Sequence, residues 1–214
     1  DITSKCNLRC AHCYNQERYW ENADKYSELD EKTIISIIDK LVLLNFTRLH
    51  LLGGEPLLAH NFRMIVEYGK KRGLDVTLVT NGTLLTGEIA EFICNSGVSL
   101  VSISMDGTSA ADNDAIRGDK VFEKVCTNIA EFNVLRKNKE SEIRLVISFT
   151  LTARNIDNSR NIISFAIEND IDEVNVSYLS EEGEARKNYE GLAIDEYEKI
   201  KYLDAIIDDY LNHD

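Results

Sequence analysis

The sequence predicts an α/β fold, a partial (β/α)6 TIM-like barrel with parallel strands and helices outside. Three observations lead to it. Short apolar runs alternate with longer amphipathic stretches along the chain, an order typical of parallel sheets covered by helices. Several strands carry polar residues along one face, which would be costly in a dry core. The chain has 214 residues, whereas a closed eight-fold barrel typically needs about 250.

Each element is placed by its residue pattern. The predicted strands are short β-branched or apolar runs at Asp1–Thr3 (the tail of a first strand), Arg48–Leu52, Asp75–Thr80, Ser99–Ser104, Ile143–Thr150 and Asp172–Tyr178. The predicted helices are Glu31–Leu44, Asn61–Arg72, Gly87–Asn95, Val121–Arg136, Asp157–Asn169 and Ile194–Leu211. Pro56 is the only proline, and because no proline-rich linker divides the chain we expect one domain over residues 1–214.

Polar residues recur on one face of the later strands. In the strand at 99–104, Val101 and Ile103 alternate with Ser102 and Ser104, so the two kinds point to opposite faces. The next two strands repeat the pattern with Ser148 and Thr150 and with Asn175 and Ser177. This repetition favours a sheet curled around a wet cavity that holds the site. An open doubly wound sheet with polar strand ends is the alternative that periodicity leaves open.

The net charge and the hydropathy of the chain limit the classes of partner that it can bind. The chain has 24 basic and 37 acidic residues, a net charge of −13, which repels phosphate backbones and anionic membranes. A nucleic-acid partner is therefore disfavoured. No apolar run approaches the roughly 20 residues that span a bilayer, and the first residues do not resemble a signal peptide. We expect a cytoplasmic protein without a membrane partner.

The cysteines favour metal binding over disulfides. Five are present, so a disulfide framework would leave one over. Cys94 and Cys126 stand alone in helical patterns and are interpreted as small buried hydrophobes. Cys6, Cys10 and Cys13 lie in one short loop, and thiolates are the usual ligands of iron–sulfur clusters. Three of them can hold three corners of a cubane and leave one iron open.

Two other metal sites remain alternatives for the same loop. Structural zinc normally takes four ligands in two separated pairs, and His12 is poorly placed to complete a tetrahedron beside Cys13. An ordinary ferredoxin cluster would need a fourth cysteine. The spacing therefore favours an iron–sulfur cluster with an open site.

A second motif ends the strand at 48–52. It reads Gly53-Gly54-Glu55-Pro56. The glycines allow a ligand to approach the backbone closely, and Pro56 restricts Glu55 to extended conformations, which fixes its carboxylate at a strand end. Such a carboxylate suits an ammonium group. By itself the motif is also consistent with a simple turn.

Together, Cys-x3-Cys-x2-Cys after one strand and Gly-Gly-Glu-Pro after the next resemble the radical S-adenosylmethionine (SAM) superfamily over the whole chain. The segments at 79–85, 102–107 and 114–118 look most like its peptide- and protein-modifying branch, which includes anaerobic sulfatase maturases and ribosomal-peptide maturases. Members of that branch usually carry a cysteine-rich SPASM or twitch extension. No cysteine follows Cys126, so we expect no auxiliary cluster in this chain, and we interpret its start as lying within the first strand.

The resemblance implies a [4Fe–4S] cluster on Cys6, Cys10 and Cys13, with SAM chelating the fourth iron. An electron from the reduced cluster would cleave SAM to methionine and a 5′-deoxyadenosyl radical, which abstracts hydrogen from a substrate. The substrate implied is a peptide or protein side chain, and the reductant an external protein such as flavodoxin or ferredoxin. No catalytic residue is assigned.

The resemblance also implies a set of SAM contacts. Glu55, helped by Pro56 and the Gly53–Gly54 backbone, would hold the amino group. Ser104 and Asp106 would contact the ribose or carboxylate, although Asp106 also suits a turn before Gly107. Further predicted contacts are Asn81 (or a turn residue), Arg117 on the SAM carboxylate (or a surface ion pair), Ser148 or Thr150 on the ribose, Leu179 on adenine, and His12 and Tyr14 beside the cluster.

Three other functions remain alternatives. One is a radical SAM enzyme acting on a small metabolite or nucleotide. Another is an iron–sulfur electron carrier or redox sensor, which would have no use for a SAM pocket at Gly53–Pro56. The third is a zinc-stabilised binding module. The segment Gln16–Tyr26 holds the only tryptophan and is interpreted as a surface segment, or as cover for the cluster.

Overall fold

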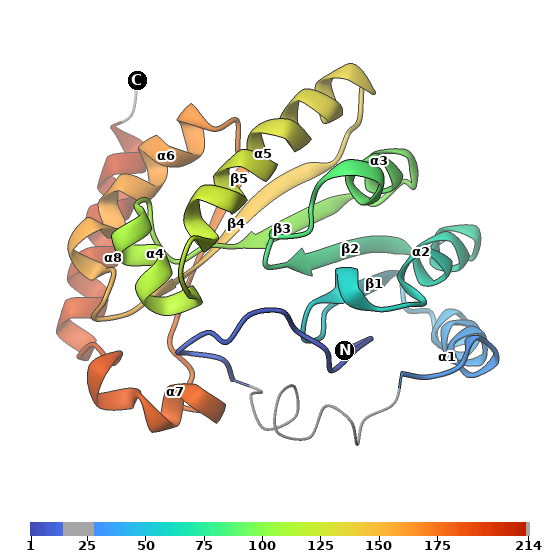
Figure 1. Ribbon diagram of the computed structural model, residues 1–214, viewed down its shortest axis with the longest axis horizontal. Helices are drawn as coiled ribbons and strands as arrows, with labels where there is room; N and C mark the ends of the chain where they lie inside the picture. The colour runs from blue at the N-terminus through green and yellow to red at the C-terminus, as the bar shows by residue number, and fades with distance from the viewer. Residues whose placement is uncertain (15–27, 213–214) are drawn as a thin grey trace.

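A parallel sheet forms the centre of the molecule (Figure 1). The structure, a computed structural model, describes residues 1–14 and 28–212. In this part the strands are β1 (Arg48–Leu51), β2 (Asp75–Thr80), β3 (Leu100–Ser104), β4 (Arg144–Leu151) and β5 (Glu173–Tyr178). They lie side by side in sequence order, and all neighbours are parallel. A doubly wound sheet would reverse this order at a switch point, so the predicted barrel-type arrangement is confirmed.

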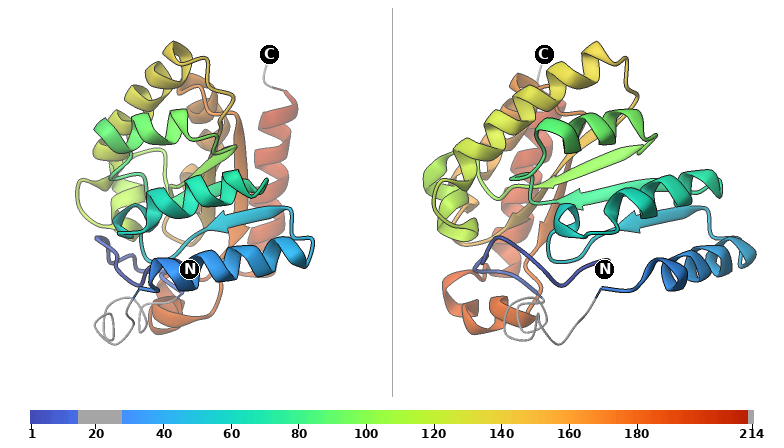
Figure 2. Two further views of the ribbon diagram at one scale, coloured as in Figure 1. Left: turned by 90° about the vertical axis from the view of Figure 1, so that its right-hand side faces the viewer. Right: turned by 45° about the vertical axis from the view of Figure 1, so that its right-hand side comes forward.

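Helices cover the outside of the sheet, except for α7 (Gly183–Lys187), which lies against the N-terminal loop. They are α1 (Glu31–Leu43), α2 (Phe62–Lys71), α3 (Gly87–Asn95), α4 (Ala110–Arg117), α5 (Val121–Asn138), α6 (Ile162–Glu168), α7 (Gly183–Lys187) and α8 (Glu196–Leu211), with 3-10 turns η3 (Pro56–Leu58), η4 (Ile156–Asn161) and η5 (Tyr189–Gly191). Two further views show α1, α2, α3 and α5 stacked in order along the outer side (Figure 2). The predicted helices outside the barrel are thus confirmed.

The core lies between the sheet and these helices. Leu78, Ile103 and Ile147 from three adjacent strands are fully buried, as is Phe132 of α5. Burial of such side chains contributes roughly 1.5–3 kcal/mol each. The other face of the strands carries the predicted polar residues, and two pairs of them are joined by hydrogen bonds. Ser102 Oγ lies 2.7 Å from Ser148 Oγ, and Thr150 Oγ1 lies 3.3 Å from Ser177 Oγ.

The first predicted strand differs from expectation. Asp1–Thr3 has no regular strand structure, although its chain runs beside the end of β1. The Ile2 N–H donates to the Leu52 carbonyl at 2.8 Å, and the Gly54 N–H donates to the Thr3 carbonyl at 2.9 Å. The next bond joins the Glu55 N–H to Lys5, so the register shifts and no ladder forms. The described part therefore contains five regular strands where six were predicted.

Two helices escaped prediction. The helix α7 has only five residues, too few for a period of 3.6 to be visible. The helix α4 begins with Ala110 and is rich in aspartate and asparagine, residues with low helix propensity. Its N-cap Ser109, whose hydroxyl accepts from the Asp112 N–H, was the available signal. The predicted helix at 157–169 starts as the 3-10 turn η4, within which the Ser159 hydroxyl donates to the Ile156 carbonyl.

Two further expectations concern the surface. No helix among residues 1–14 and 28–212 is both long and apolar enough to cross a membrane. The predicted surface segment Gln16–Tyr26 lies outside the described residues.

Candidate functional site

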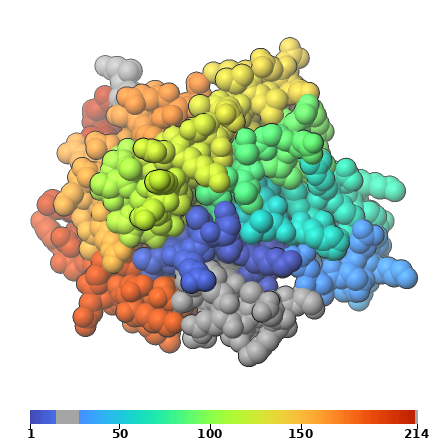
Figure 3. All heavy atoms as spheres, viewed as in Figure 1, coloured from blue at the N-terminus to red at the C-terminus, as the bar shows by residue number. Residues whose placement is uncertain are grey.

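A cavity of about 370 Å3 lies at the carboxyl ends of the strands. The carboxyl end of every described strand borders it, through Leu52 after β1, Thr80 of β2, Ser104 of β3, Thr150 of β4 and Tyr178 of β5. This edge is where parallel α/β folds place their ligands. Residues 1–14 run across it and lie between the segments near 110–118 and 180–190 (Figure 3).

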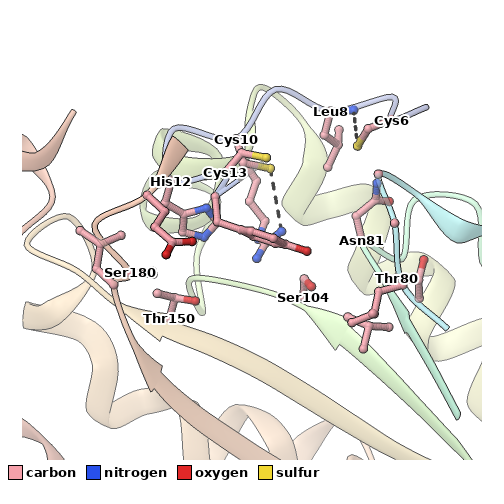
Figure 4. A pocket seen from close by; sticks show the side chains of 18 of the residues that line it. Cys6, Leu8, Cys10, His12, Cys13, Thr80, Asn81, Ser104, Thr150 and Ser180 are labelled. Carbon is pink, nitrogen blue, oxygen red and sulfur yellow. Dashed lines mark hydrogen bonds between the residues drawn. The ribbon is translucent and has the colours of Figure 1, made fainter. Parts of the chain in front are cut away.

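The three cysteines of the N-terminal loop face this cavity (Figure 4). Cys6 Sγ accepts a weak hydrogen bond from the Leu8 N–H at 3.5 Å, and Cys10 Sγ lies 4.0 Å from Arg117 Nη1. Burial raises the pKa of the Cys10 thiol to about 11, although the Arg117 charge opposes that shift. A bound metal would deprotonate such a thiol.

The donor set fits a cluster better than a single ion. Among the described residues, no three His, Cys, Asp or Glu side chains converge closely enough to hold one metal ion. Cys6, Cys10 and Cys13 nevertheless border one cavity. A cubane has its irons at separate corners, so its ligands attach at separate points. Ligands around a cavity rather than around a point are what such a cluster requires.

Gly53 and Gly54 hold the cysteine loop at close range. A Cβ on Gly53 would lie 2.6 Å from the Thr3 carbonyl oxygen, and one on Gly54 would lie 2.2 Å from the Lys5 carbonyl oxygen. Such distances are impossible for real side chains, so both positions need glycine. The glycines were predicted to admit a ligand. They border the cavity. In this structure, however, glycine is needed at both positions because the backbone of Thr3 and Lys5 packs directly against them.

Asn81 ties the cysteine loop to the end of β2. Its Nδ2 donates to Asn7 Oδ1 at 2.9 Å, and Asn7 Nδ2 donates in turn to Thr83 Oγ1 at 2.8 Å. The Thr83 hydroxyl closes the triangle on Asn81 Oδ1 at 2.6 Å. Asn7 is the residue that follows Cys6, so this network fixes the backbone next to the first cysteine of the loop.

Glu55 lies behind the cavity wall rather than in it. Its carboxylate is fully buried and accepts from the Leu57 N–H, the Thr80 hydroxyl and the Asn81 N–H at 3.1, 2.7 and 2.8 Å. Burial raises the pKa of Glu55, and these hydrogen bonds oppose the shift. The carboxylate thereby caps η3, whose first residue is Pro56. Its predicted contact with the SAM amino group stays a prediction.

Asp106 is the centre of a buried charge cluster. Its Oδ2 lies 2.7 Å from His12 Nε2 and 2.7 Å from Arg117 Nε, and its Oδ1 accepts from the Thr150 N–H at 2.9 Å. The Arg117 contact is ionic, because the Nε–H group does not point in line with an acceptor. Asp106 is fully buried. Burial alone would raise its pKa, but Arg117, His12 and the hydrogen bonds lower it to about 2.

Most predicted contacts lie together around the cavity. Its lining includes the predicted Cys6, Cys10, Cys13, His12, Tyr14, Gly53, Gly54, Asn81, Ser104, Arg117, Thr150 and Leu179. The structure places four others outside the lining, namely Glu55, Pro56, Asp106 and Ser148. Ser148 lies two residues before Thr150, on the same face of β4, and its hydroxyl is hydrogen-bonded to that of Ser102. The lining residues missed from the sequence are Leu8, Leu52, Val79, Thr80, Tyr178, Ser180 and Glu182.

Comparison with known proteins decides the family. Residues 1–163 match the radical SAM superfamily. This chain belongs to that superfamily. Its cofactors are accordingly a [4Fe–4S] cluster and SAM, as the sequence predicted, and radical SAM proteins of this kind are enzymes.

Relatives of known function are longer than this chain. The AdoMet-dependent heme synthase of Methanosarcina barkeri is 35% identical over 158 residues, covering 73% of this chain and 43% of the relative. The mycofactocin maturase MftC of Mycolicibacterium smegmatis is 32% identical over 123 residues, covering 58% of this chain and 30% of the relative. The chain thus spans less than half the length of these radical SAM relatives.

A solved structure shares the fold of the whole radical SAM chain described here. The protein anSMEcpe, with bound AdoMet and Kp18Cys peptide, aligns with 99% of this chain and 59% of its own, at a TM-score of 0.77 and 22% identity. The likeness establishes the partial barrel independently of the strand count.

Proposed function

We propose that this chain holds a [4Fe–4S] cluster on Cys6, Cys10 and Cys13 and binds SAM beneath it, in order to abstract hydrogen from a peptide or protein side chain. One observation carries the proposal. The three thiols border the same cavity as the carboxyl ends of all the described strands. A cofactor bound by the cysteines therefore faces a pocket that the barrel supplies.

The cluster would lack a fourth cysteine from the described residues. Cys94 and Cys126 lie in α3 and α5, outside the lining of the cavity. When bound, the cluster supplies the electron for SAM cleavage, and the protein contributes orientation and exclusion of water. An external reductant such as flavodoxin or ferredoxin would deliver that electron.

SAM would lie between the cysteine loop and the strand ends. The Gly53–Gly54 backbone and Asn81 offer polar contacts on one side, and Ser104 and Thr150 offer hydroxyls on the other. Apolar side chains for the adenine come from Tyr14, Val79 and Leu179. The pocket therefore combines an apolar lining with a few convergent polar groups, as small-ligand sites usually do.

Arg117 would serve this site as part of an ion pair, one of the two roles that the sequence left open. Its charge is already opposed by Asp106 at 2.7 Å, and its guanidinium reaches Cys10 Sγ at 4.0 Å. A contact with the SAM carboxylate stays a prediction. Asp106 in turn positions His12 and Arg117 without lining the cavity.

The charge of the lining supports a peptide substrate. Arg117 is the one arginine or lysine among the described lining residues, and Glu182 adds an exposed carboxylate. A substrate with several carboxylates would need cations that this lining does not offer. The maturase MftC and the peptide-bound anSMEcpe structure are similar to this chain and agree with a peptide.

A second substrate class is favoured by sequence similarity. The heme synthase of Methanosarcina barkeri is 35% identical to this chain, more than the maturase at 32%. An iron tetrapyrrole is therefore the competing proposal. Its propionate groups would have to find cations outside the described cavity lining.

The substrate proposal is tested by stimulation of SAM cleavage. The anaerobically reconstituted, reduced protein is incubated with SAM and a cell-extract peptide pool, the same pool digested to amino acids, or iron coproporphyrin. We expect the intact pool to raise 5′-deoxyadenosine formation and digestion to abolish the effect. If iron coproporphyrin stimulates the reaction and the peptide pool does not, the proposed substrate is a tetrapyrrole and not a peptide.

A further inference from the structure

The cysteine loop is hydrogen-bonded to a segment far along the chain, beyond the residues that match the superfamily. Residues 180–191 follow β5 and contain α7 and η5, whereas the family match ends at residue 163. Ser180 and Glu182 of this segment line the same cavity as the cysteines. The segment therefore borders the site directly.

Two hydrogen bonds join the segment to the backbone of the loop. The Glu184 N–H donates to the Cys13 carbonyl at 2.8 Å, and Asn188 Nδ2 donates to the Ala11 carbonyl at 3.0 Å. The two acceptors flank His12 and include the backbone of the third cysteine. Backbone bonds of this kind fix the path of the loop and hence the direction of the Cys13 side chain.

Gly183 makes this contact possible. A Cβ at this position would lie 2.3 Å from the Tyr14 carbonyl oxygen and 2.5 Å from the Cys13 carbonyl oxygen. Its φ is +55°, in the left-handed region that favours glycine. Backbone atoms cannot swing aside as a flexible side chain can, so any larger residue must separate α7 from the loop.

We infer that Gly183 and Asn188 are positioning residues for the cluster, holding Cys13 in place through the backbone of residues 11–14. The inference rests on the proposed role of Cys6, Cys10 and Cys13 as ligands. If so, the contacts of α7 with residues 11–14 determine how firmly the cluster is retained. Neither residue touches the cluster or SAM by this account.

Matched variants separate the loop contact from ordinary backbone strain. Gly87 is also the first residue of a helix, α3, and has the same φ of +55°, but a Cβ there would meet nothing within 4 Å. Gly87→Ala therefore reproduces the strain of Gly183→Ala without the collision. Asn212 donates its Nδ2 to the Asp208 carbonyl at the exposed end of α8, so Asn212→Asp is the matched control for Asn188→Asp.

The test measures cluster retention instead of turnover. Wild type, Cys13→Ala and the four variants are reconstituted without oxygen, and loss of iron to a chelator is followed through the visible absorbance of the cluster. We expect Asn188→Asp to lose iron about fivefold faster than wild type, as for one net hydrogen bond, and Gly183→Ala faster still. The Gly87→Ala and Asn212→Asp proteins should match wild type in iron loss, and thermal unfolding of the apo forms shows whether each variant remains folded.

The outcomes distinguish the two proposals. If wild type holds no cluster, or Cys13→Ala holds it equally well, the ligand role fails and the positioning role with it. If Cys13→Ala loses the cluster while Gly183→Ala and Asn188→Asp retain it like wild type, the ligands stand and the positioning role is overturned. Equal loss from Gly183→Ala and Gly87→Ala would also overturn it, because strain alone would then explain the effect.

Discussion

Arg117 Nε lies 2.7 Å from Asp106 Oδ2, and both side chains are buried at the carboxyl end of β3. This ion pair sits directly behind the cysteine loop, since Arg117 also reaches Cys10 Sγ at 4.0 Å. Asp106 was predicted from the sequence as a SAM contact. In the structure Asp106 contacts His12, Arg117 and the Thr150 N–H, and its predicted SAM contact stays a prediction.

Asp106→Asn should destabilise the fold strongly. The substitution leaves the Arg117 charge buried without a counter-ion, which typically costs about 3 to 5 kcal/mol. Denaturant unfolding of the apo protein measures it. The control is Asp170→Asn, which breaks an exposed pair with Lys137 at 2.8 Å and should change nothing measurable. Equal stability of the two variants would show that the buried Arg117 charge does not depend on Asp106 as its counter-ion.

Asp106 should stay ionised far below the usual range of aspartate. Its pKa in the folded protein is about 2, against about 3.9 in an unfolded chain. A depressed pKa means that its stabilising contribution is complete above about pH 4 and is lost as pH falls towards 2. Carboxyl-carbon NMR measures the titration directly. A midpoint near 4 for Asp106 would contradict the buried ion pair.

Glu55→Gln should destabilise the apo protein even without SAM. The carboxylate accepts from the backbone N–H groups of Leu57 and Asn81, and an amide can accept on only one side. One buried donor is then left unpaired, at a cost of about 1–3 kcal/mol. Thermal or denaturant unfolding provides the measurement, with Glu67→Gln on the exposed face of α2 as control. Wild-type stability in Glu55→Gln would mean that the carboxylate is free for a ligand.

Gly54→Ala should loosen the cysteine loop. The new Cβ would lie 2.2 Å from the Lys5 carbonyl oxygen, and overpacking of this kind costs about 1–3 kcal/mol. Gly191→Ala is the matched control, because its Cβ would meet only Arg154 Nη2, at 3.8 Å. We expect lower iron content after reconstitution in Gly54→Ala alone. Similar iron in both variants would disprove the close packing of residues 3–5 on the glycines.

The strands and the cysteine site followed from local patterns. Alternating Val101, Ser102, Ile103 and Ser104 already separated the core face from the cavity face, because side chains of a strand alternate strictly. The cysteine spacing likewise indicated a cluster, since all three cysteines lie in one loop. Such signals are contained within a few consecutive residues and need no knowledge of the tertiary structure.

The partners of the buried carboxylates could not be predicted in this way. Glu55 receives two of its three hydrogen bonds from residues 25 and 26 positions away, and Asp106 faces His12 across 94 positions. Which groups surround a carboxylate depends on strands and loops that only the fold brings together. The contact of α7 with Cys13 escaped for the same reason, because a five-residue helix gives no periodic signal.

The central claim is that the three cysteines and the cavity beneath them cleave SAM. The direct measurement is 5′-deoxyadenosine formed from SAM by the reconstituted, dithionite-reduced protein, compared with Cys10→Ala and with Cys94→Ala, whose thiol lies in α3 outside the cavity lining. We expect product from wild type and Cys94→Ala and none from Cys10→Ala. An intact [4Fe–4S] cluster in the wild-type protein that never yields 5′-deoxyadenosine would contradict it and favour an electron carrier.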